Sequence, residues 1–490
     1  MDWLAAPEWW WGRLILERGM AAVYLIAFIC AARQFRGLIG RHGMLPVPQY
    51  LAHRSFRDTP SLFHLHYSDG FYAAVAWIGA VISAAMLVGI ADAVPVWAAM
   101  PLWLILWVMY QSIVNVGQIW YSFGWESLTL EAGLLVVFVG NNDIAPPVLV
   151  MWLTRWLLFR VEFGAGLIKL RGDRCWRDLT CLDYHHETQP MPGPLSWFFH
   201  RLPRPFHRVE VAGNHFAQLV VPFGLFAPQP IASVAAAIIA VTQFWLVLSG
   251  NFAWLNWVTI VLAASVIDTS TIASTLGIAP PADVSATQPL WYAVLVVAFT
   301  ALVVVLSWRP AKNLVSRRQR MNSSFDPLHM VNTYGAFGSI NRTREEVVLE
   351  GAALADPDVT GWKEYEFRGK PGDVRRLPRQ WSPYHLRLDW LMWFASISPS
   401  YALPWLIPLC HGLLTNEPSI VRLLRTNPFP DTPPFYVRAT LYRYRFSTAR
   451  ELVSQRVWWQ RDRIGEYLAP LSVDEARRMT GAPRRDLRSG

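Results

Sequence analysis

The chain has few charged residues and few cysteines for its length. Charged residues make up 16% of the 490 positions, and there are four cysteines. The low charge argues against a soluble globular protein, which ordinarily carries about 25% charged residues. Four cysteines are too few for a disulfide scaffold. The sequence also lacks the G-x-S-x-G, P-loop, G-x-G-x-x-G and H-E-x-x-H signatures, which disfavours an enzyme without excluding one.

Apolar residues dominate what is present. The chain is 53% hydrophobic, contains 26 tryptophans and has a mean hydropathy of +0.23. A helix needs about 20 apolar residues to cross a bilayer, and windows near that length predict spans at Leu14–Ala32, Phe71–Ala91, Val94–Val114, Leu128–Val139, Val148–Leu170, Val211–Ala227, Ile231–Ser249, Ala253–Ala273 and Leu290–Trp308. Residues 1–308 are therefore predicted to form a polytopic α-helical membrane domain with about eight or nine transmembrane helices.

The ends of the predicted spans indicate how the chain meets the membrane. The N-terminus has a tryptophan cluster suited to the membrane interface and no basic leader, so we expect an uncleaved first helix. The formal net charge of +9 comes with no basic stripe or motif typical of nucleic-acid binding, and anionic lipid headgroups explain it more simply. The lipid bilayer is the expected partner, and nucleic acid is not expected to bind.

The chain changes character after Trp308. Several arginines follow at once and no further bilayer-length apolar run occurs. Residues 309–490 are predicted to form a water-exposed α+β domain. Strands are expected at residues 345–352, 364–369 and Phe435–Phe446, helices at His385–Ser396, Pro404–Leu414 and Ser419–Thr426, and a flexible tail at Gly481–Gly490.

A polar loop, residues 171–208, interrupts the membrane domain. Its candidate functional residues are Arg171, Asp173, Cys175, Arg177, Asp178, Cys181, Asp183, His185, His186 and Glu187. The two cysteines are compatible with a disulfide, a redox-active pair or two free thiols. The Cys spacing is wider than C-x-x-C and the histidines are adjacent, so a metal would require the loop to fold back, and none is expected.

Ionisable residues also occur within the predicted spans, where they are costly and ordinarily face a bundle interior or a wet cavity. Arg155, Glu162 and Lys169 are seven residues apart and so lie near one helix face, and Glu126 and Glu131 could pair with them. A structural ion-pair network is the simpler interpretation, and a substrate or proton site is the alternative.

Long motifs in this sequence resemble the lipase maturation factor family of polytopic membrane proteins. They are WYSFGWES (Trp120–Ser127), FGAGLIKLRGDRCWRDLTCLDYHHETQPMP (Phe163–Pro192), NHFAQLVVPF (Asn214–Phe223), SGNFAWLNW (Ser249–Trp257), HMVNTYGAFGSI (His329–Ile340), SPYHLRLDWLMWF (Ser382–Phe394) and WWQRDRIGEY (Trp458–Tyr467). They follow one another over most of the chain. The membrane half is also similar, in architecture alone, to the transmembrane domain of vitamin K-dependent carboxylases.

The resemblance implies a membrane-embedded factor that helps secreted homodimeric lipases or other exported clients to fold and assemble, with no cofactor. It implies a multi-pass protein of the endoplasmic reticulum membrane if eukaryotic, or of the inner membrane if bacterial, with the polar loop and the C-terminal domain on the lumenal or periplasmic side. The arginine-rich loops alone favour the opposite orientation. Candidate client-facing residues are Asn332, Tyr334, Tyr384, His385, Asp389 and Trp390.

A second hypothesis belongs to another class. A membrane-bound enzyme or redox protein could act on a lipid or quinone-like substrate through the 171–208 loop. It predicts a pocket lined by the loop histidines, Glu187 and the cysteines, together with Arg155, Glu162 or Lys169. The folding-factor hypothesis predicts instead exposed apolar patches on the C-terminal domain and no deep polar pocket. Residues 382–394 are expected either to form the core helix of that domain or to offer a patch to a partner.

Overall fold

The membrane half is a bundle of helices. The computed structural model describes residues 2–278, 288–354 and 361–480. The longer bundle helices are α1 (Trp10–Leu38), α3 (Asp69–Val88), α5 (Val96–Val116), α6 (Gly124–Val136), α7 (Val148–Arg171), α11 (Arg204–Leu219), α13 (Ile231–Ser249), α14 (Leu255–Ala264) and α16 (Leu290–Leu306). Shorter elements connect them: η1 (Asp2–Leu4), η2 (Pro7–Trp9), α2 (Val47–Leu51), η3 (Leu62–His64), α4 (Ile90–Ala93), η4 (Gln118–Tyr121), α8 (Arg174–Arg177), α9 (Leu182–Thr188), α10 (Ser196–His200), α12 (Val221–Gly224), α15 (Thr269–Leu276) and α17 (Trp308–Val315).

Five helices among the described residues are long and apolar enough to cross a bilayer. They are Pro7–Leu38, Asp69–Val88, Val96–Val116, Ile231–Ser249 and Leu290–Val315, and the α14–α15 pair, bent by 94°, makes a sixth if it is counted as one span. The multi-pass prediction is confirmed, whereas the count of eight or nine spans is not. The last apolar helix also runs to Val315, beyond the expected boundary at Trp308.

Three expected spans differ from the prediction for separate physical reasons. Helix α6 has 13 residues, too short to span, and every one of them is buried. Helix α7 has 24 residues but carries several buried charges, so it is an interior helix of the bundle. The expected span at Val211–Ala227 is divided, because α11 ends at Leu219 and α12 is a separate short turn. Apolar run length alone does not distinguish a span from a buried helix.

Helix α3 illustrates how local sequence sets the ends of a span. The Ser68 hydroxyl accepts a hydrogen bond from the Phe71 N–H (3.0 Å), which satisfies a free donor at the first turn. The helix stops at Gly89, whose φ of 110° is a left-handed conformation that glycine adopts without steric cost. Outward-facing Val81 is 67% exposed, as expected for a side chain that contacts lipid tails.

The C-terminal domain pairs an antiparallel sheet with helices. The sheet order is β4-β3-β5-β6 and a separate two-stranded sheet joins β1 to β2. The strands are β1 (Ser323–Ser324), β2 (Asn332–Thr333), β3 (Arg344–Ala352), β4 (Lys363–Glu364), β5 (Tyr436–Phe446) and β6 (Trp459–Leu471). The helices are α18 (Arg387–Ile397), α19 (Pro399–Leu414), α20 (Pro418–Val421), α21 (Ala449–Gln455) and α22 (Val473–Thr480).

The α+β prediction for this domain is confirmed, with corrections at individual elements. The strands expected at 345–352 and 435–446 are β3 and β5, which pair along their length with Val347 opposite Leu441. The strand expected at 364–369 is reduced to β4 and an isolated bridge, and α20 is shorter than expected. Strand β6 was not among the predicted strands. The expected tail, 481–490, lies outside the described residues.

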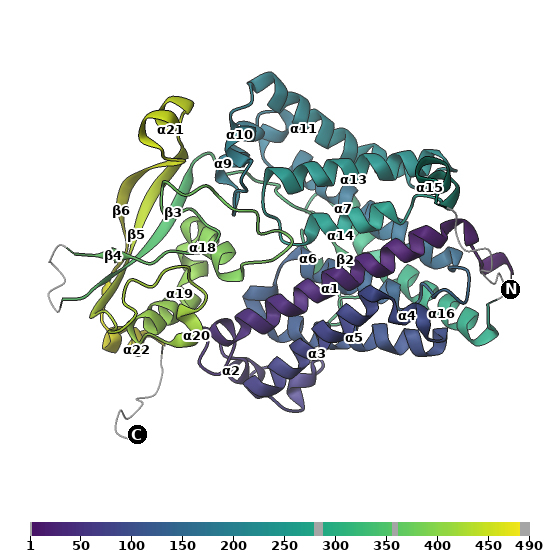
Figure 1. The fold of residues 1–490 in the computed structure, drawn as a ribbon, viewed down its shortest axis with the longest axis horizontal. Helices are drawn as coiled ribbons and strands as arrows, with labels where there is room; N and C mark the ends of the chain where they lie inside the picture. The colour runs from purple at the N-terminus through teal and green to yellow at the C-terminus, as the bar shows by residue number, and fades with distance from the viewer. Residues whose placement is uncertain (1, 279–287, 355–360, 481–490) are drawn as a thin grey trace.

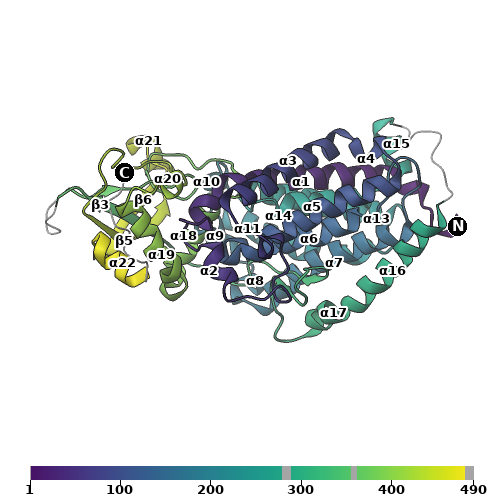
Figure 2. The same cartoon turned by 90° about the horizontal axis from the view of Figure 1, so that it is seen from below.

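The bundle and the sheet domain lie end to end (Figures 1 and 2). Helix α1 runs from the N-terminal end of the bundle to the end beside the sheet domain, where α2, α9 and α10 also lie (Figure 1). Arg387 in α18 pairs with Glu126 in α6 (2.7 Å), and Trp197 Nε1 in α10 donates to the Ser447 carbonyl after β5 (2.9 Å). The polar loop is therefore placed between the membrane helices and the sheet.

Candidate functional site

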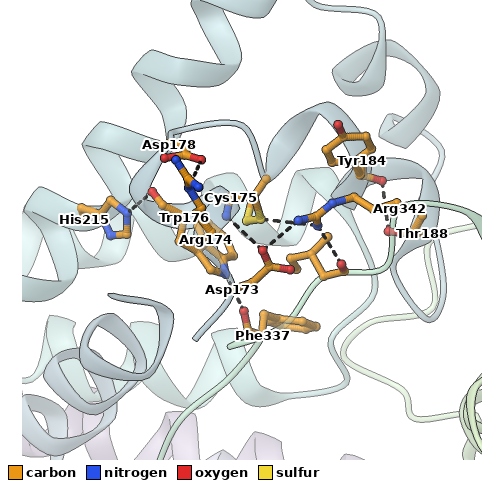
Figure 3. The surroundings of a disulfide bond; sticks show 12 residues. Asp173, Arg174, Cys175, Trp176, Asp178, Tyr184, Thr188, His215, Phe337 and Arg342 are labelled. Atoms are coloured by element: carbon orange, nitrogen blue, oxygen red, sulfur yellow. Dashed lines mark hydrogen bonds and ion pairs between the residues drawn. A yellow bond between two sulfur atoms is a disulfide. The ribbon is translucent and has the colours of Figure 1, made fainter. Parts of the chain in front are cut away.

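The polar loop begins with a short disulfide-closed turn. Asp173 follows α7 and caps α8, because its Oδ1 accepts from the Cys175 N–H (3.0 Å). Cys175 and Cys181 form a disulfide, so they are not two free thiols in this structure (Figure 3). Both cysteines are buried together with Trp176 in a small apolar cluster. The disulfide is thus part of a folded unit.

The disulfide turn is attached to the segment that leads into the sheet. Arg342 Nη2 lies 2.7 Å from Asp173 Oδ1, and hydrogen bonding from this guanidinium lowers the pKa of Asp173 below its ordinary value. The Asp173 N–H donates to the Gly338 carbonyl (2.7 Å), and Trp176 Nε1 donates to the Phe337 carbonyl (2.8 Å). Figure 3 shows the contacts of Arg342 with Asp173 and of Trp176 with Phe337 beside the disulfide. Movement of the sheet domain would therefore act on the loop directly.

The three outward-facing loop candidates are solvated. Arg171 Nη1 donates to Gln319 Oε1 (2.6 Å), and Arg177 Nη1 reaches the Leu170 carbonyl (3.4 Å). Asp178 pairs with Arg174 at 3.1 Å on the surface. Such exposed contacts contribute little to stability.

The histidine pair on α9 is buried. His185 packs against the rings of Phe252 and Phe337, and burial lowers its pKa to about 3. His186 is 2% exposed, its Nε2 lies 3.8 Å from Glu210 Oε2, and burial lowers its pKa as well. Both rings are consequently neutral near neutral pH.

The remaining loop carboxylates hold neighbouring elements together. Glu187 Oε2 accepts from the Phe446 N–H at the end of β5 (2.6 Å) and lies 3.6 Å from His200 Nε2. Burial raises the pKa of Glu187. Asp183 Oδ1 lies 3.0 Å from His207 Nδ1 in α11. The loop is therefore fixed to the sheet on one side and to the bundle on the other.

One grouping in this region has the spacing of a loose metal site. Among the described residues, His186, His207 and Glu210 place one ligand atom each within 4.8 Å of one another. His207, however, already uses both ring nitrogens, toward Asp183 Oδ1 and the Phe199 carbonyl, each at 3.0 Å. Because no lone pair of His207 is free in this arrangement, we assign no metal here.

The predicted intramembrane charges separate into distinct contacts. Glu131 pairs with Arg160 of α7, and Glu126 pairs with Arg387, so neither carboxylate pairs with the seven-residue series as expected. The sequence analysis did not single out Arg160 or Arg387. Each arginine lies inside an apolar run of the sequence, and this pattern predicts a buried acidic or carbonyl partner.

The seven-residue series itself divides. Arg155 Nη1 donates to the Leu225 carbonyl (3.1 Å) and its guanidinium lies over the rings of Trp9 and Trp152. Glu162 and Lys169, farther along α7, face a cavity. The three residues lie on one face of α7, but Arg155 contacts Trp9 and Trp152 while Glu162 and Lys169 line the cavity.

The six candidate client-facing residues lie inside the molecule. Asn332, Tyr334, His385, Asp389 and Trp390 are each at most 3% exposed and Tyr384 is half-buried. Tyr334 donates to Glu131 (2.7 Å), and the Gly369 N–H donates to Asp389 (2.5 Å). These side chains join the domains in this structure, and a client could reach them only after a rearrangement. Residues 382–394 accordingly belong to the core, one of the two expected outcomes.

A cavity of about 790 Å³ lies where the loop meets the membrane helices. Its wall includes Glu162, Lys169, His185 and His186, together with many aromatic and aliphatic side chains. The enzyme hypothesis predicted such a pocket for these four residues, whereas the folding-factor hypothesis predicted no deep polar pocket. Arg155, Glu187 and the disulfide do not line it among the described residues.

The fold and this site define a class: a multi-pass membrane protein whose disulfide-closed loop is fixed to a C-terminal sheet domain. Comparison with known proteins gives the family. A model described as the lipase maturation factor transmembrane domain matches residues 11–274, and the lipase maturation factor C-terminal domain matches residues 330–469. The chain belongs to the lipase maturation factor family.

Relatives match along nearly the whole chain. Lipase maturation factor 1 of Bos taurus is 43% identical over 97% of this chain and 91% of the relative, and that of Homo sapiens is 40% identical over 97% and 90%. Lipase maturation factor 2 of Gallus gallus is 29% identical over 94% of this chain and 82% of the relative. No solved structure matches.

Proposed function

We propose that this protein is a membrane-embedded folding factor that assists the assembly of secreted lipases. The observation that carries the proposal is the similarity to lipase maturation factor 1 over 97% of the chain, which includes both the membrane helices and the sheet domain. A folding factor needs a surface for its client and no catalytic group.

The disulfide supports a sidedness for this activity. Structural disulfides persist in oxidising compartments. Cys175–Cys181 lies in the loop that contacts the segment leading into the sheet domain. We infer that this end faces the endoplasmic reticulum lumen in a eukaryote, or the periplasm in a bacterium. The arginines of the basic segments oppose this orientation by charge count, but Arg174 in the loop pairs with Asp178, and Arg342, which follows the last span, pairs with Asp173.

Individual exposed apolar side chains on the sheet domain are candidate client contacts. Val453 in α21 is 83% exposed, Phe435 before β5 is 56% exposed and Ile464 in β6 is 43% exposed. Exposed apolar groups on a water-facing domain favour contact with partly folded chains, which present apolar surface of their own. We propose that these exposed side chains, rather than the six candidates named from the sequence, contact the client.

A pocket of the kind that the enzyme hypothesis predicts is present, but, among the described residues, those that would carry out a reaction are not assembled in it. The cysteines are joined in a disulfide away from the cavity, and His185 packs against aromatic rings. A nucleophile paired with a base is the usual mark of such a site, and the described cavity wall supplies no cysteine or serine within hydrogen-bond distance of either histidine. The cavity therefore supports ligand binding more than catalysis.

Site-specific crosslinking tests the proposed function. A photoreactive residue replaces Val453 in cells that also make a secreted homodimeric lipase, and a matched variant carries it at Val305, which is 70% exposed on α16. We expect the lipase to crosslink from position 453 and not from 305. Lipase crosslinks that are absent at 453, or equal at the two positions, would contradict a client surface on the sheet domain.

A further inference from the structure

The cavity opens toward the lipid-facing side of the bundle. Phe216 of α11 is 52% exposed, and Val241 and Trp245 of α13 are 71% and 43% exposed, yet all three also line the cavity. Helix α13 is one of the five helices apolar enough to span a bilayer. An opening between α11 and α13 would consequently admit molecules from the membrane rather than from water.

The size and walls of the cavity suit a lipid chain. Ligand pockets in proteins have volumes of roughly 300–1,000 Å³, and this one is about 790 Å³. Aromatic side chains such as Trp125, Phe252 and Trp390 form much of its wall. Such a surface would be costly to leave in contact with water, so an apolar occupant is expected.

Polar atoms without partners lie on the same wall. Asn256 is 3% exposed; its Nδ2 donates to Gln243 Oε1 (2.7 Å), while its Oδ1 has no hydrogen-bond partner among the described residues. His186 Nδ1 is likewise buried without a partner there. Because an unpaired buried polar atom costs free energy, these atoms indicate a ligand that offers hydrogen-bond donors.

The one lysine of the described cavity wall already has two amide partners and an aromatic ring beside it. Lys169 Nζ donates to Asn214 Oδ1 (2.7 Å) and Gln218 Oε1 (2.9 Å) and lies 4.8 Å from the centre of the Trp176 ring. Glu162 lies on the same helix face, where its Oε1 accepts from Gln243 Nε2 (2.6 Å). No other lysine or arginine lines the described cavity. A carboxylate or phosphate headgroup would compete with the amide partners of Lys169 for its donors, whereas a hydroxyl headgroup would find acceptors without a partner at Asn256 and His186 among the described residues.

We propose that this cavity binds a single-chain membrane lipid with an uncharged, hydroxyl-bearing headgroup, such as a monoacylglycerol. The acyl chain lies along the aromatic wall, and the hydroxyls donate to Asn256 Oδ1 and to a ring nitrogen of His186. The lipid enters between α11 and α13. This site is independent of the proposed lipase client, whose surface lies on the sheet domain.

Photolabelling of the full chain in phosphatidylcholine nanodiscs tests the site. The probe is a monoacylglycerol with a diazirine in its acyl chain, and peptide mass spectrometry locates the label. We expect labelling within residues 252–259, where Phe252 and Asn256 are buried cavity residues. Excess unlabelled monoacylglycerol should abolish it. Labelling of these residues that resists competition, or that is missing, would overturn the proposal.

A blocking variant and a matched control separate the cavity from the outer surface. Gly213 of α11 lines the cavity, and a Cβ there would meet no atom within 4 Å, so Gly213→Trp can fill the opening without a backbone clash. The neighbouring Ala212 is exposed on the same helix and does not line the cavity. We expect Gly213→Trp to lose the labelling and Ala212→Trp to retain it. Retained labelling in a folded Gly213→Trp protein would contradict the assignment.

Competition by other lipids tests the headgroup. We expect the monoacylglycerol to compete at about a tenfold lower concentration than a fatty acid or lysophosphatidylcholine of equal chain length, the change that one buried hydrogen bond contributes. The Asn256→Leu variant should lose this preference while still binding the chain. Equal competition by the charged lipids in the wild-type protein would refute an uncharged headgroup.

Discussion

Replacing Arg387 should uncouple the sheet domain from the membrane helices. Arg387 is fully buried in α18 and its Nη1 lies 2.7 Å from Glu126 Oε1 in α6 and donates to the Trp120 carbonyl (2.5 Å). Its guanidinium also lies 3.5 Å from the centre of the Tyr121 ring. Arg387→Met keeps an unbranched apolar stem, shortens the side chain, and removes its charge and its donors.

The expected cost follows from the buried pair. Two charges 2.7 Å apart attract by about 6 kcal/mol at an effective dielectric constant of about 20. Desolvation offsets much of this attraction in the intact pair. Removal of one partner leaves the other charge buried and unpaired, at a cost of about 3–5 kcal/mol. We expect Arg387→Met to lower the free energy of unfolding by that amount.

The measurement is unfolding in mixed detergent micelles, with a double variant as control. Arg387→Met with Glu126→Gln removes both charges, and the amide oxygen introduced at position 126 can still accept the hydrogen bond that Tyr110 donates to the wild-type carboxylate. The double variant should lie within about 2 kcal/mol of the wild type, because replacing both members of a buried pair is often nearly neutral. A single variant that loses under about 1 kcal/mol, or a double variant as unstable as the single, would refute the reasoning.

Three further predictions concern the loop and its orientation. Replacing Cys175 and Cys181 with serine should cost about 2 kcal/mol of unfolding free energy, the loop-closure entropy of a short ring, and an unchanged unfolding midpoint would contradict this. Burial holds the pKa of His185 at about 3, against 6.5 in the unfolded chain. Between these values the unfolded chain binds more protons, so the free energy of unfolding falls as pH drops from 6.5 toward 3. His185→Phe should flatten that pH dependence, and an identical slope in the variant would contradict the prediction. In sealed vesicles whose lumenal or periplasmic face is outside, an impermeant maleimide should label Val453→Cys. It should label Trp3→Cys, near the N-terminus, only after the vesicles are opened. The reverse pattern would show the opposite orientation.

The sequence predicted those features whose signals are local. Apolar run length identified the membrane half, and alternating β-branched and aromatic residues identified β5. Motif order identified the family. Run length failed for α6 and α7, because a buried helix and a membrane span share an apolar composition and differ in their surroundings.

The contacts that organise the site connect residues far apart in the sequence. Glu126 and Arg387 are an example, since no pattern near either one names its partner. The residues 382–394 gave an ambiguous signal, because an aromatic helix suits a domain core and a client surface equally, and burial of Trp390 decides for the core. The cavity combines side chains from α7, α9, α11, α13 and α14, so only the assembled fold shows it.

Lipase secretion tests the central claim most directly. Cells that lack their own lipase maturation factor 1 would make a secreted homodimeric lipase with and without this chain, and the activity per unit mass of secreted lipase would be measured. We expect the chain to raise this specific activity well above that of cells without it. A chain that folds in the membrane of these cells, yet leaves the specific activity at the level of the deficient cells, would contradict its role as a lipase folding factor.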